Sequence, residues 1–257
     1  MKSLKQLDAK KIKYLFTDID DTLTKDGLLQ QEAYSALWKL HKQNIQVIPV
    51  TGRPAGWCEL IARQWPVRGV IGENGGFYFY YQNKKMHRKF VFTEEVRVEN
   101  QKKLKKIEHE VLSSISGSAL ASDQFCRLMD LAIDFCEDVT PLSPKDIQKI
   151  VSIFEAHGAV AKVSSIHVNG WFGNYDKLSM CQEYCKDVLG FELDSNNEAV
   201  VFVGDSPNDE PMFKFFKNSV GVANVTEFKL NSPPKFITHK KRGKGFAELA
   251  DWILASQ

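Results

Sequence analysis

Three carboxylates follow one short apolar run near the start of the sequence. The run 14–16 leads directly into Asp18, Asp20 and Asp21. A short apolar run bounded by polar turn residues predicts a buried strand. Carboxylates crowded at the end of a strand repel one another and favour protonation unless a cation keeps them ionised. Mg²⁺ takes oxygen ligands, and ligands of open α/β sheets bind at the carboxyl ends of the strands, so the sequence predicts a metal site here.

Two later apolar runs also end in polar residues. The run 45–50 (IQVIPV) ends at Thr51, and the run 199–203 (AVVFV) ends at Gly204 and Asp205. Because the carboxyl ends of parallel strands meet at one edge of a sheet, we expect Asp18, Thr51 and Asp205 to converge. Taken alone, Asp205 equally suits a turn or a helix cap, and a metal ligand is favoured only because another acidic strand end lies opposite.

The order of the predicted helices and strands that must position these residues changes along the chain. The β-α-β-α-β order up to residue 81 predicts a parallel sheet with crossover helices. An α-β-α-β unit with fewer buried strands follows, which indicates an antiparallel α+β insert. The alternation of helices and buried strands then resumes. Helices are predicted over 28–43, 55–64, 97–115, 143–157, 175–189, 210–217 and 245–255, and further strands over 69–71, 77–81, 125–135, 159–168, 219–222 and 236–237.

Charge and hydropathy exclude several classes of partner. The 257 residues carry a formal net charge of +2, too small for a global field that attracts nucleic acid or membranes. Basic runs such as 102–106 and 240–244 lack interleaved aromatic residues and are interpreted as solvated faces. Residues 1–13 lack the apolar core of a signal peptide, and no apolar run approaches a membrane span. We therefore expect a cytoplasmic protein with no nucleic-acid or membrane partner.

Four stretches, taken together and in order, resemble the motifs of the haloacid dehalogenase superfamily. They are DIDDT at 18–22, Thr51 in VTGRP, Lys177 in GNYDKLSM and GDSPND at 204–209. The matching segments lie toward both ends of the chain, and the insert carries almost no motif. The resemblance implies a Rossmann-like three-layer α/β core with a parallel sheet, formed by residues 1–82 and 172–257, and an inserted α+β cap domain at 83–171.

The resemblance also implies roles for individual residues. Asp18 would attack phosphorus and become an aspartyl phosphate, and Asp20 would protonate the leaving alcohol and later take a proton from water. Lys177 would neutralise charge on the phosphate and on Asp18. The implied phosphate-binding residues are Thr51, Gly52, Lys177 and Asn208. The implied ligands of Mg²⁺ are Asp18, Asp20 through its main-chain carbonyl, Asp205, and Asp209, which either supports the water shell of the metal or orients Lys177.

The position of the insert, between the second and third motifs, resembles the large cap found in sugar-phosphate phosphatases and phosphomannomutases. Such a cap closes over the cleft and selects the substrate, with hinges expected near 82 and 170–173. Arg53 is either a surface residue or a substrate contact. The glycine-rich turn at 72–76 either contains glycines only because the backbone adopts unusual angles there, or faces the cleft and contacts the substrate. The candidate substrate contacts are Arg53, Glu73, Asn74, His167 and Asn169, with Arg127 and Lys162 as further guesses.

The sequence thus predicts a Mg²⁺-dependent phosphatase, monomeric or homodimeric, whose substrate is a small phosphorylated metabolite of the sugar-phosphate type. The first alternative is a phosphohexomutase, which would return the phosphoryl group to the sugar. The second is a non-catalytic binder that retains the fold, although a binder would have no need of Asp20.

Overall fold

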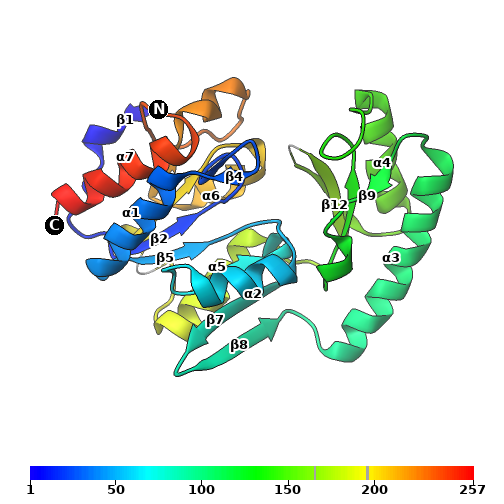
Figure 1. Ribbon diagram of the computed structural model, residues 1–257, viewed down its shortest axis with the longest axis horizontal. Coiled ribbons are helices and arrows are strands. Elements are labelled where there is room, and N and C mark those ends of the chain that lie inside the picture. The colour runs from blue at the N-terminus through cyan, green and yellow to red at the C-terminus, as the bar shows by residue number, and fades with distance from the viewer. Residues whose placement is uncertain (165, 195–196) are drawn as a thin grey trace.

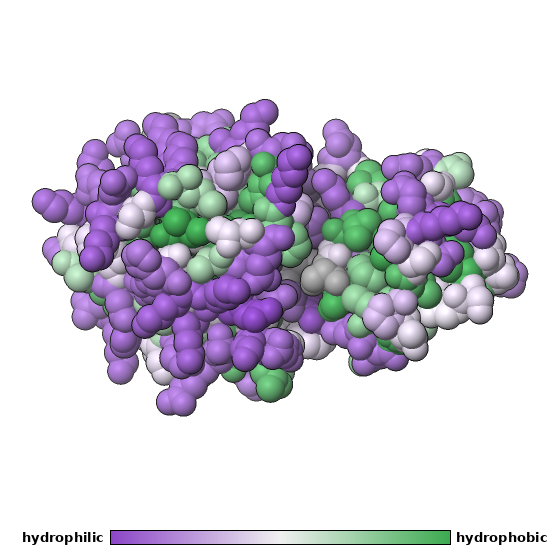
Figure 2. All heavy atoms as spheres, turned by 90° about the horizontal axis from the view of Figure 1, so that it is seen from above, coloured by the Kyte–Doolittle hydropathy of each residue, from purple (hydrophilic) through white to green (hydrophobic). Residues whose placement is uncertain are grey.

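The computed structural model describes residues 1–164, 166–194 and 197–257. The chain forms a larger part, which contains both termini, and a smaller part, which contains the helices α3 (Glu94–Ser114) and α4 (Pro144–Ala156) (Figure 1). A furrow separates the two parts in the space-filling view (Figure 2).

A six-stranded sheet, parallel throughout, organises the larger part. Its strand order is β1-β15-β14-β13-β2-β5. The strand bounds are β1 Lys2–Ser3, β15 Phe236–Ile237, β14 Asn218–Gly221, β13 Val200–Gly204, β2 Tyr14–Thr17 and β5 Gln46–Pro49. The predicted α/β core with a parallel sheet is therefore confirmed.

Successive residues of the central strands point to opposite faces of this sheet, as the pleat requires. Leu15 belongs to one buried apolar cluster and Phe16 to a second. Helices cover both faces, which explains why β13, the strand beside β2, is apolar and buried along its whole length. The first cluster includes residues of α1 (Gln31–Lys42), α2 (Ala55–Gln64) and α7 (Arg242–Ala255), and the second includes residues of α5 (Lys177–Tyr184) and α6 (Glu210–Phe215).

The strand register brings the ends of β2, β5 and β13 level with one another. Thr17 lies opposite Val203 on one side and Pro49 on the other. The Asp18 N–H donates to the carbonyl of Val203 at 2.9 Å, one residue beyond the ladder. The residues that follow each of these strands therefore meet at one edge of the sheet.

A second, antiparallel sheet extends the larger part. It consists of β6 (Val70–Gly72), β7 (Phe77–Gln82) and β8 (Lys85–Phe90) in that order. The sequence predicted a continuous parallel sheet as far as residue 81, and this is wrong in part, because β6 contributes only an isolated parallel bridge between Val50 and Ile71. Since β8 pairs with β7 along its whole length, we propose that the insert begins after Phe90 rather than at residue 83. A short hairpin of β3 (Thr24–Lys25) and β4 (Leu28–Leu29) follows Asp18.

The smaller part is an antiparallel sheet packed against α3 and α4. Its order is β11-β12-β10-β9, with bounds β11 Val160–Val163, β12 His167–Trp171, β10 Leu131–Asp134 and β9 Ala119–Leu120. A separate apolar cluster joins the sheet to the helices through residues such as Leu104, Ile150 and Val168. Ser143 is the N-cap of α4, because its hydroxyl accepts from the Asp146 N–H at 3.2 Å.

Two predicted strands of the insert are wrong in extent. The stretch 125–135 forms a 3₁₀ turn at Gln124–Cys126, a loop and only then β10, because the loop residues are fixed by buried polar contacts rather than by a ladder. The stretch 159–168 contains two antiparallel strands, β11 and the start of β12; position 165 of that prediction lies outside the described residues. Within the described ranges, none of the helices is both long and apolar enough to cross a membrane.

Candidate active site

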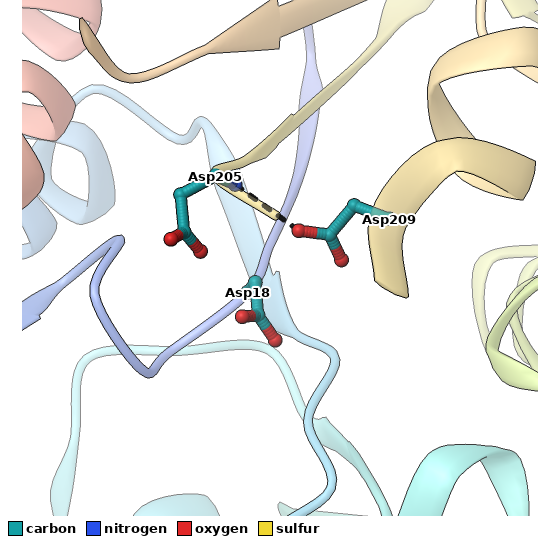
Figure 3. A group of neighbouring side chains, drawn as sticks. All are labelled: Asp18, Asp205 and Asp209. Atoms are coloured by element: carbon teal, nitrogen blue, oxygen red, sulfur yellow. Dashed lines mark hydrogen bonds between the residues drawn. The ribbon is translucent and has the colours of Figure 1, made fainter. Parts of the chain in front are cut away.

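Three buried carboxylates converge at the carboxyl edge of the parallel sheet. Asp18 follows β2, Asp205 follows β13, and Asp209 lies at the start of α6 (Figure 3). One carboxylate oxygen from each lies within 4.8 Å of the others, and the three residues are 8%, 4% and 0% exposed. The predicted meeting of the first and fourth motifs is therefore present in the structure.

Lys177 supplies the positive charge of this group. Its Nζ donates to Asp18 Oδ1 at 2.9 Å and to Asp209 Oδ1 at 3.1 Å. The lysine is the first residue of α5, whose N-cap, Asp176, accepts from the Ser179 N–H at 2.7 Å. Although burial alone would lower the pKa of Lys177, the two carboxylates raise it above its ordinary value, so the ammonium stays charged. The third motif thus lies where the resemblance implied.

The electrostatic balance of the cluster favours an additional cation. The pKa of Asp18 is raised to about 7, chiefly because the carboxyl is buried; Lys177 acts in the opposite direction, and Asp209 and Asp20 add to the increase. Burial, Asp209 and Asp18 likewise raise the pKa of Asp205 well above its usual range. A single ammonium does not compensate three buried carboxylates, and a divalent ion held by their oxygens would keep them ionised.

Hydrogen bonds fix the two later carboxylates in place. Asp205 accepts from Thr22 Oγ1 at 3.2 Å and from Asn224 Nδ2 at 3.1 Å. Asp209 Oδ2 accepts from the Asp205 N–H at 3.1 Å, the contact drawn in Figure 3. Gly204 is required here, because a Cβ at that position would lie 2.3 Å from Asp209 Oδ2.

A cavity of about 380 Å³ opens over this cluster and is lined by both parts of the chain. That volume lies within the range of small-molecule sites. The core contributes Asp18, Asp20, Asp21, Gly52, Arg53, Asn74, Lys177, Asp205 and Asn208 among others, and the insert contributes Arg127, Ser164, His167 and Asn169. Most of the predicted phosphate and substrate contacts thus lie at one cavity.

Three predicted contacts do not line the cavity: Thr51, Glu73 and Lys162, which was one of the further guesses. Thr51 is fully buried behind Gly52, and its Oγ1 accepts from the Arg53 N–H at 3.0 Å. Glu73, predicted as a substrate contact, is wrong: its side chain is fully buried and accepts from the backbone N–H groups of Ala55 and of residues 128–130. Three of these donors belong to the insert and the fourth, Ala55, begins α2 of the core, so the carboxylate joins the two parts of the chain.

Asp20 has a different partner from the three metal-site carboxylates. Its oxygens accept from Arg53 Nε at 3.2 and 3.1 Å and from Arg53 Nη2 at 2.9 Å. Its carboxylate is not part of the group formed by Asp18, Asp205 and Asp209. The use of its main-chain carbonyl as a metal ligand stays a prediction. Asp21 is paired with Arg242, whose Nε donates to Asp21 Oδ1 at 2.8 Å.

The sequence analysis missed several polar residues around the cavity. Asp123 and Asp130 hold Arg127 in buried ion pairs at 3.0 Å. Glu137 contacts both Arg53 and His167. Asn224 lies in the segment that follows β14, near the same edge of the sheet, but not directly at the strand end as Asp205 does. The residues of the insert do not lie at strand ends of the parallel sheet.

Comparisons with known proteins agree with this arrangement. A family model described as haloacid dehalogenase-like hydrolase matches residues 15–130 and 173–249. A phosphoglycolate phosphatase of Haloarcula marismortui is 26% identical over 241 residues, which cover 91% of this chain and 94% of that protein.

Solved structures share the fold at low identity. The crystal structure of Thermoplasma acidophilum 0175 has a TM-score of 0.74 at 19% identity and covers 95% of this chain and 98% of its own. The sucrose-phosphatase of Synechocystis, in complex with sucrose and phosphate, has a TM-score of 0.64 at 15% identity, with coverage of 93% and 97%.

The role of Glu73 as a tie between core and insert can be tested by Glu73→Gln. A glutamine places an amide N–H₂ against backbone donors, and a lost buried hydrogen bond costs about 1–3 kcal/mol. We expect the amide protons of residues 128–130 to exchange about tenfold faster or more, measured by hydrogen exchange. Glu59→Gln, which changes an exposed glutamate paired with Arg63 and Arg88, should leave these amides unchanged. Equal exchange in Glu73→Gln and the unaltered protein would contradict this role.

Proposed function

The chain belongs to the haloacid dehalogenase-like hydrolase family, and from that premise we propose that it is a Mg²⁺-dependent phosphatase of small phosphorylated metabolites, acting through an aspartyl phosphate on Asp18. The observation that carries the proposal is the ion pair of Lys177 with Asp18 and Asp209, beside Asp205 and open to a cavity. Phosphoryl transfer depends mainly on positioning and charge neutralisation, and these residues supply both.

In the first step the Asp18 carboxylate attacks phosphorus. A bond forms between an Asp18 oxygen and phosphorus as the bond from phosphorus to the substrate oxygen breaks, and protonated Asp20 gives its proton to the departing alkoxide. Lys177 lies close enough to Asp18 to neutralise charge on the phosphoryl group. Asn208 and the backbone at Gly52 border the cavity and are proposed phosphate contacts.

In the second step water attacks the same phosphorus. The Asp20 carboxylate accepts the proton of the water, the bond between Asp18 and phosphorus breaks, and inorganic phosphate is released with Asp18 restored. Asp20 therefore acts as acid first and as base second, and it ends with the proton that the next turnover requires.

Asp18, Asp205 and Asp209 fit a divalent cation. Their oxygens are close together, and the raised pKa of Asp18 and of Asp205 indicates uncompensated negative charge. Mg²⁺ is the proposed ion because it prefers carboxylate and carbonyl oxygens and retains water ligands. When bound, it would neutralise negative charge on the phosphoryl oxygens.

The cavity supports a polyol substrate such as a sugar phosphate. Arg127 is already neutralised by two aspartates, and Asn169 and His167 offer polar side chains suited to hydroxyl groups. Asn74 Nδ2 is buried at the cavity and has no hydrogen-bond partner among the residues that the structure describes, which leaves a donor for substrate. The similar proteins include a phosphoglycolate phosphatase and, among the solved structures, a sucrose-phosphatase, and the substrates these names indicate differ widely in size.

Release of inorganic phosphate tests the proposal. With Mg²⁺ and a panel of hexose phosphates and aryl phosphates, the protein should release phosphate, and Asp18→Asn should lower kcat by roughly 10⁴-fold or more because an amide is a poor nucleophile. Asp251→Asn, on the exposed surface and paired with Lys39, is the matched control and should retain full activity. Equal activity of Asp18→Asn, or isomerisation of a hexose phosphate without phosphate release, would contradict the proposal.

The affinity for Mg²⁺ should depend on pH in the absence of substrate. Because the pKa of Asp18 is raised to about 7, its carboxyl is protonated below that pH, and Mg²⁺ must displace the proton. We expect the affinity to fall by at least about tenfold for each unit of pH lost below 7, because Asp205, whose pKa is also raised, must lose its proton as well; proton release on binding is measured by titration calorimetry in buffers of different ionisation enthalpy. An affinity independent of pH between 5 and about 8 would refute this expectation.

A further inference from the structure

Arg53 holds the Asp20 carboxylate from inside the protein. The arginine side chain is 7% exposed, whereas that of Asp20 is 32% exposed at the cavity. Nε and Nη2 of Arg53 together contact both oxygens of Asp20, at 2.9–3.2 Å. A planar guanidinium that binds both oxygens fixes the plane of a carboxylate as well as its position. Arg53 therefore determines where the Asp20 oxygens lie.

The remaining nitrogen of the same guanidinium faces the insert. Arg53 Nη1 lies 3.5 Å from Glu137 Oε1 and 3.7 Å from Asp123 Oδ2. The other oxygen of Glu137 is 2.9 Å from His167 Nε2, and Trp57 packs against the guanidinium at 4.5 Å from its ring centre. The acid–base carboxylate of the core and two carboxylates of the insert thus share one buried cation.

The loop that carries Glu137 is itself held in place. Asp134, at the end of β10 and 1% exposed, accepts from the backbone N–H groups of Cys136, Glu137 and Asp138 at 2.7–2.9 Å. The backbone of Glu137 is therefore tied to the sheet of the insert. A movement of the insert would carry Glu137 and Asp123 with it and leave Arg53 with Asp20 alone.

We propose that Glu137 is a positioning residue for leaving-group protonation: from the insert it orients Arg53, and through Arg53 it sets the Asp20 carboxyl against the departing oxygen. Asp123 assists it. The inference rests on the proposed phosphatase function and extends it, because it makes the acid–base geometry complete only when the insert is docked. Arg53 and Glu137 thus connect the acid–base residue of the core to His167, which lines the insert side of the cavity.

The kind of leaving group separates this role from a structural one. An alkyl phosphate releases a strongly basic alkoxide, which needs the proton of Asp20, whereas a nitrophenyl phosphate releases a stabilised nitrophenolate that departs without it. Loss of acid alignment therefore lowers kcat/KM for alkyl phosphates selectively, since kcat/KM includes the first transfer to Asp18. A purely structural tie between core and insert would lower both values by the same factor.

The test compares Glu137→Gln with the unaltered enzyme on an alkyl phosphate and on p-nitrophenyl phosphate, with Mg²⁺ present. We expect kcat/KM for the alkyl phosphate to fall about tenfold or more, a fraction of the 10²–10⁴ that general acid catalysis contributes, and that for the nitrophenyl ester to change by less than about threefold. Arg53→Lys, which keeps the charge and loses the fork geometry, should show the same selectivity.

Glu110→Gln is the matched control. Glu110 also lies on the insert and pairs with a histidine, His157, at 2.7 Å, but it makes no contact with Arg53 among the described residues. Glu110→Gln should leave both kcat/KM values unchanged. Thermal unfolding of each variant checks that it is folded. Equal losses on both substrates, or no loss in Glu137→Gln, would overturn the inference. If the unaltered enzyme hydrolyses neither ester, the proposed function itself fails, and that result is distinct from the other two.

Discussion

Repulsion among buried carboxylates is the constraint on which this site depends. Parallel strands bring Asp18 and Asp205 to one edge, and Asp209 reaches them from the start of α6. An isolated buried charge costs several kcal/mol, so such a group persists only when cations and hydrogen bonds compensate it. Lys177 compensates part of the negative charge, and Thr22 and Asn224 donate hydrogen bonds to the Asp205 carboxylate. The negative charge that stays uncompensated would bind a metal ion, and that ion would in turn neutralise charge on a phosphoryl group.

A second set of buried charges joins the insert to the core. Glu73 binds backbone N–H groups of the insert, and Arg127 of the insert donates to the carbonyl of Gly52 at 3.0 Å. Conversely, Arg53 of the core lies against Glu137 of the insert. Breaking one partner of a buried pair costs about 3–5 kcal/mol, so these contacts favour the arrangement that encloses the cavity. Of these contacts, the one between Arg53 and Glu137 also involves the arginine that binds Asp20.

The catalytic edge was predictable from sequence, while the surroundings of the insert were not. Asp18 and Asp205 follow from the ends of apolar runs, which are local patterns, and Lys177 follows from the resemblance of four ordered segments to the family motifs. Glu73 was mispredicted because its donors at 128–130 lie more than 50 residues away in the sequence and are brought to it only by docking of the insert. For the same reason the stretch 125–135 was predicted as a strand, although its buried loop is set by tertiary contacts that no periodicity encodes.

The central claim is that Asp18 becomes covalently phosphorylated during turnover. The direct measurement is rapid acid quenching of the enzyme during hydrolysis of a phosphate ester, followed by peptide mass spectrometry. The account predicts a transient acyl phosphate on the peptide that contains Asp18, which forms and decays at rates compatible with kcat. Turnover with no phosphorylated peptide at any quench time, or with the phosphoryl group on another residue, would contradict it.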